Sequence, residues 1–368
     1  MIIYFLTILI LFAFSFLEDN YRVTSGLKKS MIYFSYFILV SQVGLRWETG
    51  TDWMSYYNHF TLFSNFTSLF LSDFEYGYGL FVWLIKSIFP YYSIFLLFHA
   101  IIYYFLIFKS FKRYTPNLYL SLLLFYTLSM GVMGSNRQLI ALAICIYAVK
   151  FIIDKKPFVF LLLIFLAVLF HTTALIFVIY YFLNRNIKPV PFLSILVFAF
   201  IIGKTQLPLL IFSGLGNLVG GQISYRTFAY TEGAKDVLSN ASLSIIGLLK
   251  RLVFLSIFYY NRKYLRERLI YYNILLNGYY IGLVIYFLFA SSLLIIVNRG
   301  SVYFTIMEPL LIASQMLMLK GKDTKLVGLI ILLVFSIFFF FQSIATYPDL
   351  FIPYKGIFIN SDYHRYLY

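Results

Sequence analysis

The stretch Leu45–Tyr57 reads LRWETGTDWMSYY and places three charged residues, Arg46, Glu48 and Asp52, among two tryptophans and two tyrosines. Long apolar runs precede and follow it along the chain. Charged side chains are costly to bury in a bilayer unless they are paired or reach water. The stretch is therefore expected to lie at the mouth of membrane spans and to face water or a ligand.

The composition of the whole chain is that of a membrane protein. Of its 368 residues, 62% are hydrophobic and only 12% are charged, with a mean hydropathy of +0.86, whereas soluble domains carry about 25% charged residues. Repeated apolar runs of about 18 residues or more predict an all-α, polytopic transmembrane helical bundle. We interpret residues 1–368 as a single integral membrane domain. Its first run has no basic n-region and no small-residue cleavage site, so it is expected to be a retained helix.

We expect about 10–12 spans, near residues 2–17, 30–45, 92–108, 118–133, 138–153, 158–183, 190–212, 241–260, 269–297, 300–319 and 326–345. Residues 76–90 form a shorter, aromatic-rich segment that favours an interfacial or re-entrant helix. The run 158–183 is too long for one crossing of a core about 30 Å thick. Either this run breaks, with His171 as the break point, or residues 184–220 contain an extra short crossing.

The net charge of +15 comes from basic residues that gather mainly in short loops between the predicted spans. Such clusters set the orientation of a membrane protein, so the charge does not indicate nucleic-acid binding. Placing them in the cytoplasm puts both termini and the loops at about 46–90 and 205–240 outside. The single cysteine, Cys145, lies in mid-span and excludes a disulfide framework or a cysteine metal site.

Ionisable residues within or beside the spans are candidates for function because each is costly to bury unpaired. They are Arg46, Asp52, Arg137, His171, Lys250, Arg251, Arg299 and Glu308. Most fall in the outer half of the predicted topology, where several cations together favour an anionic ligand. Glu308 is interpreted as the counter-charge of the Lys250–Arg251 step.

Each candidate also has a structural alternative. Arg46 and Arg299 sit at span ends, where arginine side chains often extend to lipid head groups. Asp52 can cap a helix or pair with Arg46, Arg137 can anchor a span, and His171 can be a satisfied core residue. The step Asp73-Phe74-Glu75 can hold a divalent cation, or its acids can be solvated loop residues.

The order of several short motifs resembles the EpsG-like, Wzy-type polysaccharide polymerases. The motifs are Leu45-Arg46-Trp47-x-x-Gly50-Thr51-Asp52-Trp53-x-x-Tyr56, Glu75-x-Gly77-Tyr78, Asn136-Arg137-Gln138, His171-Thr-Thr-Ala174, and Asn298-Arg299 with Tyr303-Phe304. The terminal Ile352-Pro353-Tyr354 is in keeping with them. The resemblance extends over residues 1 to about 310.

The resemblance implies a multi-pass enzyme of the bacterial inner membrane that builds O-antigen, capsular or exopolysaccharide. Such enzymes transfer a glycan from undecaprenyl pyrophosphate to the non-reducing end of a new lipid-linked repeat unit, on the outer face of the membrane. Besides lipid-linked glycans and membrane lipids, a chain-length regulator and a flippase are the partners to consider. No cofactor and no metal are implied.

Roles for individual residues follow from the resemblance together with the charge of the leaving group. Functional importance is carried over to Arg46, Asp52, Arg137, His171 and Arg299, and Arg46 and the external-loop residue Arg226 are further candidates for binding the substrate or its pyrophosphate. Guanidinium groups of Arg137, Arg299 and Arg251 are expected to bind the pyrophosphate. His171 is expected to act as the general base. Asp52 is the other catalytic candidate, as the base or as the residue that orients the acceptor or Arg46.

Three other classes of protein remain open at this stage. A flippase or transporter of lipid-linked oligosaccharides also needs charged residues in a cavity, although no symmetry between halves of the chain is evident. A glycosyltransferase that uses polyprenyl-phosphate sugars would bind a metal at Asp73 and Glu75. An acyltransferase of surface glycans would share the multi-span form and a lone histidine.

Overall fold

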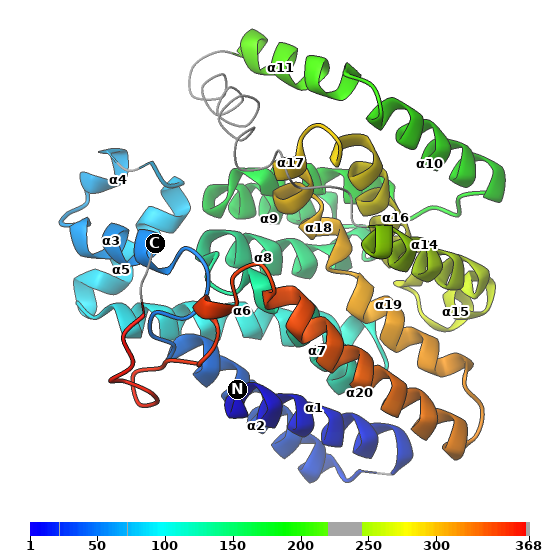
Figure 1. The fold of residues 1–368 in the computed structure, drawn as a ribbon, viewed down its shortest axis with the longest axis horizontal. Coiled ribbons are helices and arrows are strands. Elements are labelled where there is room, and N and C mark those ends of the chain that lie inside the picture. Colours follow the sequence, from blue (N-terminus) through cyan, green and yellow to red (C-terminus); the bar gives the residue numbers. More distant parts are fainter. Residues whose placement is uncertain (22, 72, 220–244, 366–368) are drawn as a thin grey trace. The chain divides into compact units, whose positions relative to one another are not determined.

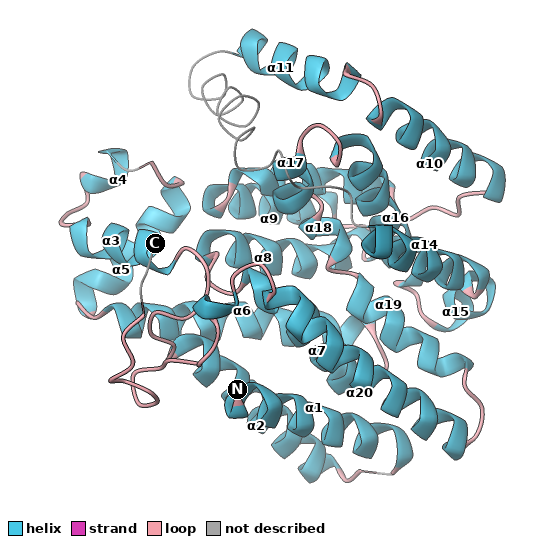
Figure 2. Cartoon of the chain, in the orientation of Figure 1, coloured by secondary structure: helices cyan, strands magenta, loops and turns pink. Residues whose placement is uncertain are grey.

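The structure is a computed structural model that describes residues 1–21, 23–71, 73–219 and 245–365. Within these ranges the secondary structure is helical, with two isolated β-bridges and no strand (Figure 2). The predicted all-α, polytopic bundle is therefore confirmed. Contacts group the chain into two compact units: Met1–Val178 with Ile312–Tyr368, called the first unit, and Ile179–Leu311, called the second unit. The expectation of a single domain over residues 1–368 stays a prediction.

The first unit contains seven longer helices and several short ones, labelled in Figure 1. The longer helices are α1 (Ile2–Asn20), α2 (Ser25–Gly44), α6 (Tyr92–Tyr114), α7 (Leu118–Leu128), α8 (Asn136–Ile153), α9 (Pro157–Phe170) and α20 (Lys322–Ile344). The short ones are α3 (Trp53–Leu62), α4 (Ser68–Leu71), α5 (Tyr76–Ile88) and the 3₁₀ segments η1 (Met130–Val132), η4 (Met316–Met318) and η5 (Pro348–Leu350). Helices α2, α6, α8 and α9 pack in succession, and α1, α7 and α20 pack together.

The first unit has a basic end and an opposite end that carries Arg46. At the basic end, Arg113 from the last turn of α6 pairs with Asp154 just after α8, at 2.7 Å. Lys28 in the first turn of α2 lies at that end as well, in a pocket shared with the last turn of α6. At the other ends of α2 and α8, Arg46 contacts Asn136. The orientation of the two ends in a membrane stays a prediction that rests on these basic clusters.

The second unit is arranged around α16 (Tyr272–Phe289), which contacts most of the other helices of that unit. These are α10 (Pro189–Gly203), α11 (Leu207–Val219), α14 (Ile245–Tyr260), α15 (Arg262–Arg268), α17 (Leu294–Gly300) and α18 (Val302–Thr305). The first turn of α19 (Glu308–Gln315) belongs to it too. Tyrosine and glycine allow close packing on α16, since a Cβ on Gly278 would overlap the hydroxyl of Tyr180.

Five described helices are long and apolar enough to cross a membrane: α1, α6, α8, α16 and α20. Other expected spans are divided into shorter segments. The break at His171 is confirmed: α9 ends at Phe170, His171 is extended (φ −157°, ψ 118°), and the 3₁₀ segment η2 (Thr172–Phe182) follows. The run 190–212 is divided between α10 and α11, and 269–297 between α16 and α17. Residues 76–90 form the expected short helix, α5.

Candidate functional site

The stretch that follows α2 is held by the backbone of the chain just before α8. The Thr51 amide donates to the Met133 carbonyl at 3.0 Å. Gly50 and Gly134 both have positive φ angles, +97° and +117°, and a Cβ on Gly134 would overlap the carbonyl oxygen of Thr51. Only glycine therefore fits at the positions where the two segments cross. This crossing places the residues of the 45–57 stretch beside Asn136 and Arg137.

Arg46 points into the unit and is fully buried. Its Nη1 donates to the Val43 carbonyl at 2.8 Å, and its Nη2 donates to Asn136 Oδ1 at 2.7 Å. The Asn136 carbonyl in turn accepts from His99 Nε2 at 2.8 Å. Arg46 therefore holds the first residue of α8 in place, one position before Arg137.

The expected pair between Arg46 and Asp52 is not formed. Asp52 is exposed and has a left-handed backbone conformation, with φ +56°. Its carboxylate accepts a hydrogen bond from Ser135 Oγ at 3.3 Å, whereas the Arg46 guanidinium runs inward to Asn136. The two side chains leave the same loop in different directions, so Asp52 does not orient Arg46. Its side chain also does not cap α3, which begins after it.

Arg137, the next residue of α8, is held by an ion pair, a hydrogen bond and a ring contact. Its Nη1 forms an ion pair with Glu75 Oε2 at 2.5 Å, and its Nε donates to the Tyr56 hydroxyl at 3.3 Å. The guanidinium lies 4.0 Å from the centre of the Phe74 ring. The Arg137 side chain is 19% exposed and that of Glu75 is 8% exposed. This arrangement fixes the plane of the guanidinium and leaves Nη2 without a hydrogen bond to any described residue.

The residue that follows His171 binds the carboxylate of Glu75 as well. The Thr172 amide donates to Glu75 Oε1 at 3.2 Å, and His171 Nδ1 lies 2.6 Å from Thr173 Oγ1. Burial alone would raise the pKa of Glu75, but the positive charges of Arg137 and His171 and the amide hydrogen bonds outweigh it and lower that pKa. Glu75 is therefore ionised at neutral pH, and it links Arg137 to the residue that follows His171.

Sequence reasoning did not identify Glu75 as this partner, although the Asp73-Phe74-Glu75 step drew attention to it. The signal available was an acid placed directly before the short helix α5, two residues before the close approach of Gly77 to Leu169. The described residues contain no group of three or more His, Cys, Asp or Glu side chains placed to hold a metal ion. Arg137 and Thr172 take up both oxygens of Glu75.

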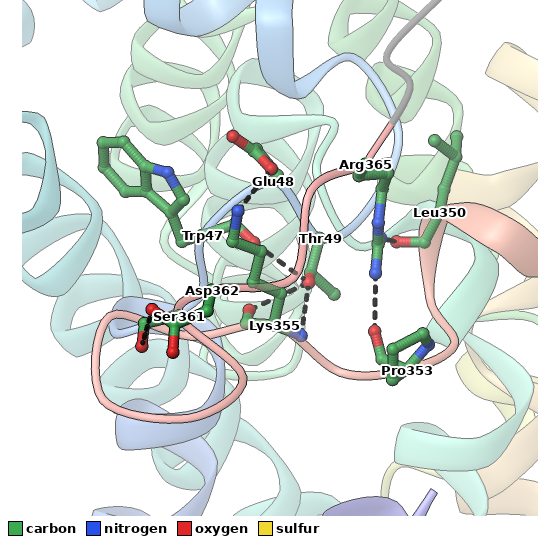
Figure 3. A network of polar contacts seen from close by, with 9 residues as sticks. All are labelled: Trp47, Glu48, Thr49, Leu350, Pro353, Lys355, Ser361, Asp362 and Arg365. Carbon is green, nitrogen blue, oxygen red and sulfur yellow. Dashed lines mark hydrogen bonds and ion pairs between the residues drawn. The ribbon is translucent and has the colours of Figure 1, made fainter.

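The C-terminal segment fastens the start of the same stretch (Figure 3). Lys355 Nζ pairs with Glu48 at 2.7 Å, and the Lys355 side chain is only 4% exposed. The Thr49 hydroxyl donates to the Lys355 carbonyl at 2.9 Å, and the Lys355 amide donates back to Thr49 Oγ1 at 3.0 Å. Arg365 donates to the carbonyls of Leu350 and Pro353 and holds the segment folded on itself. No pattern in the sequence predicted this contact, although the neighbouring Ile352-Pro353-Tyr354 belongs to the family resemblance.

The remaining candidates lie in the second unit or outside the described residues. The expected role of Glu308 as a counter-charge is confirmed, because Lys250 Nζ pairs with it at 2.8 Å. Arg251 donates to the Gly247 carbonyl of its own helix and lies 4.5 Å from the centre of the Tyr286 ring. Arg299 is exposed in the last turn of α17. Arg226 lies outside the described residues, and the three-arginine pyrophosphate site stays a prediction.

Comparison with known proteins gives one match. Residues 29–356 match the model of the EpsG family. None of the curated proteins and none of the solved structures matches the chain. The family match includes Arg46, Glu75, Arg137 and His171, the residues that the first unit gathers at one end.

Proposed function

The chain belongs to the EpsG family, which indicates a membrane-associated polysaccharide polymerase, and we propose that it joins lipid-linked oligosaccharide repeat units. It transfers the glycan from undecaprenyl pyrophosphate to the non-reducing end of a new lipid-linked unit, on the outer face of the bacterial inner membrane. The new glycosidic bond forms as the acceptor hydroxyl attacks the anomeric carbon and the bond to the pyrophosphate oxygen breaks. The pyrophosphate takes the electron pair, and the acceptor hydroxyl gives up its proton.

The observation that carries this proposal is the Arg137–Glu75 pair beside His171. A leaving pyrophosphate gains negative charge, and a guanidinium held in a fixed plane stabilises that charge without having to reorient. Glu75, Tyr56 and Phe74 supply this fixed plane, and Nη2 of Arg137 is the donor that remains for the ligand. Glu75 is thus a positioning residue.

His171 supplies the base in this proposal. When Nδ1 donates to Thr173 Oγ1, Nε2 carries the lone pair that accepts the proton of the acceptor hydroxyl. The Thr172 amide binds Glu75 directly after His171, so the base and the guanidinium are fixed by one carboxylate. Because Asp52 lies exposed on the loop before α3, we assign it to the binding of the acceptor sugar.

The experiment uses a strain that lacks the polymerase and makes its lipid-linked repeat unit. Such a strain accumulates single-repeat lipid-linked glycan on the outer face, and the wild-type gene restores long glycans. Arg137→Ala, Arg137→Lys and His171→Ala are expected to restore none at matched protein levels. Arg113→Ala is the control, because Arg113 also pairs with an acid but lies at the basic end of the unit.

Each result has a definite meaning. Long glycans from both Arg137 variants overturn the assigned role of this residue. Failure of Arg137→Lys separates a planar, directional guanidinium contact from a simple membrane anchor, which lysine would replace. Repeat units that stay on the inner face in the deletion strain indicate a flippase and overturn the polymerase proposal.

A further inference from the structure

A pocket of about 390 Å³ lies at the basic end of the first unit, between the start of α2 and the end of α6. Its lining includes both lysine ammonium groups and apolar side chains. The apolar side chains include Met31, Ile32 and Leu118, called the apolar wall below. The lysines are Lys28, Lys29 and Lys112, and no residue that lines the pocket belongs to the Arg137 site.

The three lysines give the pocket a positive charge that the neighbouring acids do not neutralise. Lys28, Lys29 and Lys112 are exposed, and none forms an ion pair within 4 Å with an acid among the described residues. The acids at the end of α1 are engaged with protein groups. Glu18 accepts from the Tyr119 amide at 3.3 Å, and the carboxylate of Asp19 accepts from the side chain of a neighbouring asparagine.

We propose that this pocket binds the headgroup phosphate of an anionic phospholipid in the leaflet at the basic end. Basic pockets between membrane helices favour such headgroups, and the cytoplasmic leaflet, where the basic end is expected, is the anionic one. The apolar wall gives the glycerol and the first part of the acyl chains a surface to contact. A small soluble anion would leave this wall exposed, so the combined surface matches a lipid better than free phosphate.

The pocket also lies between two helices whose opposite ends are near the Arg137 site. Lys28 and Lys29 lie in the first turns of α2, and Lys112 lies in the last turn of α6, two helices that pack along their length. A phosphate held by lysines from both helices links their ends. Bound lipid is therefore expected to stabilise the protein against thermal unfolding, since a ligand that binds only the folded state shifts the equilibrium toward it.

The test measures binding of dioleoyl-phosphatidylglycerol to the purified full-length protein in a neutral detergent, by native mass spectrometry and by the shift in Tm. Dioleoyl-phosphatidylcholine and inorganic phosphate are the comparison ligands. The double variant Lys28→Gln/Lys112→Gln is compared with Lys155→Gln/Lys156→Gln. Both remove two positive charges from the basic end, but Lys155 and Lys156 do not line the pocket.

We expect one phosphatidylglycerol to bind more tightly than phosphatidylcholine. Affinity should fall roughly fivefold per lysine, hence about 25-fold in the pocket variant, with little change in the control. Lys28→Arg/Lys112→Arg should retain binding. Equal losses in the pocket and control variants would mean that diffuse surface charge attracts the lipid, and would overturn the proposal. So would equal binding of the two lipids, or binding of inorganic phosphate with the affinity of the lipid. None of these results depends on polymerase activity.

Discussion

Replacing Glu75 by glutamine tests the reasoning about the Arg137 site most directly. The substitution keeps the size of the side chain and one carbonyl oxygen, but it removes the charge that holds Arg137. The pair is short, 2.5 Å, and its two side chains are only 19% and 8% exposed. Solvent therefore cannot replace the lost carboxylate fully, and Arg137 is left with a neutral amide oxygen, the Tyr56 hydroxyl and the Phe74 ring but no negative charge.

The expected magnitude follows from this burial. Two charges about 4 Å apart near a protein surface interact by about 4 kcal/mol, and removing one partner of a buried pair costs about 3–5 kcal/mol. We expect Glu75→Gln to lower the free energy of unfolding by about 3 kcal/mol. A preorganised donor to developing charge contributes about 100-fold or more to the rate, so the polymerisation rate per folded molecule should fall about 100-fold.

The assay follows glycan length with time for purified protein and lipid-linked repeat units, with Tm measured on the same samples. Asp154→Asn is the matched control, because its pair with Arg113 has the same chemistry but side chains that are 45% and 30% exposed. Such exposed pairs contribute about 0–1 kcal/mol. A rate for Glu75→Gln within threefold of the wild type would refute the positioning role of Glu75. The double variant Glu75→Gln/Arg137→Gln should regain stability without regaining activity, because no buried charge is left unpaired.

The pH dependence of the same pair has a defined sign. The pKa of Glu75 is lower in the folded state than its ordinary value, so the stabilisation is complete at neutral pH. It begins to decline below about pH 4.3, the ordinary pKa of glutamate, and it is lost as the pH falls through the folded-state pKa. The difference in unfolding free energy between wild type and Glu75→Gln should therefore shrink only below about pH 4.3.

Three further predictions concern the surroundings of the site, each checked by unfolding in detergent. Glu48→Gln should destabilise the protein more than Lys355→Met, because the former leaves a lysine side chain that is 4% exposed without its partner; equal effects would contradict this. Arg46→Lys should cost about 1–3 kcal/mol, because an ammonium cannot reach both acceptors of the fork; an unchanged Tm would contradict it. Burial, then the charges of Arg137 and Lys86, lowers the pKa of His59 to about 4, so stability should fall from about pH 6.5 to pH 4 as the unfolded chain alone gains the proton. His59→Gln should remove this fall, and an unchanged profile would refute it.

The sequence predicted those features that depend on local patterns of charge and length. A run of 26 apolar residues had to break, and His171 was the polar residue at which it does. Two cations within one span needed a partner, and Glu308, an acid within another span, was the expected counter-charge. Arg137, His171 and Arg299 were expected to form one centre; Glu75 contacts Arg137 and the residue after His171, and the three-residue centre stays a prediction. In each case the cost of burying charge in an apolar environment carried the prediction.

The pairings across long separations were beyond the reach of the sequence. Glu48 and Lys355 are 307 residues apart, and Arg137 and Glu75 are 62 residues apart. Nothing in the local pattern distinguishes a solvated loop acid from one that an arginine on another helix reaches. The Arg46–Asp52 pair, one of the alternatives for Asp52, is absent for the same reason, because proximity in sequence did not reveal that Arg46 reaches inward to Asn136.

The Arg137–Glu75 pair also bears on how a charged ligand can be bound at the end of an apolar bundle. An unpaired guanidinium that is 19% exposed would cost the folded state several kcal/mol, whereas the neutral pair lowers this cost. If an incoming pyrophosphate had to displace Glu75, binding would first have to break that pair. In the proposed site this displacement is unnecessary, because Nη2 would donate to the ligand while Nη1 stays on Glu75. Glu75 would then keep its contact with Arg137 before and after the ligand binds, and its removal should impair activity more than it impairs ligand binding.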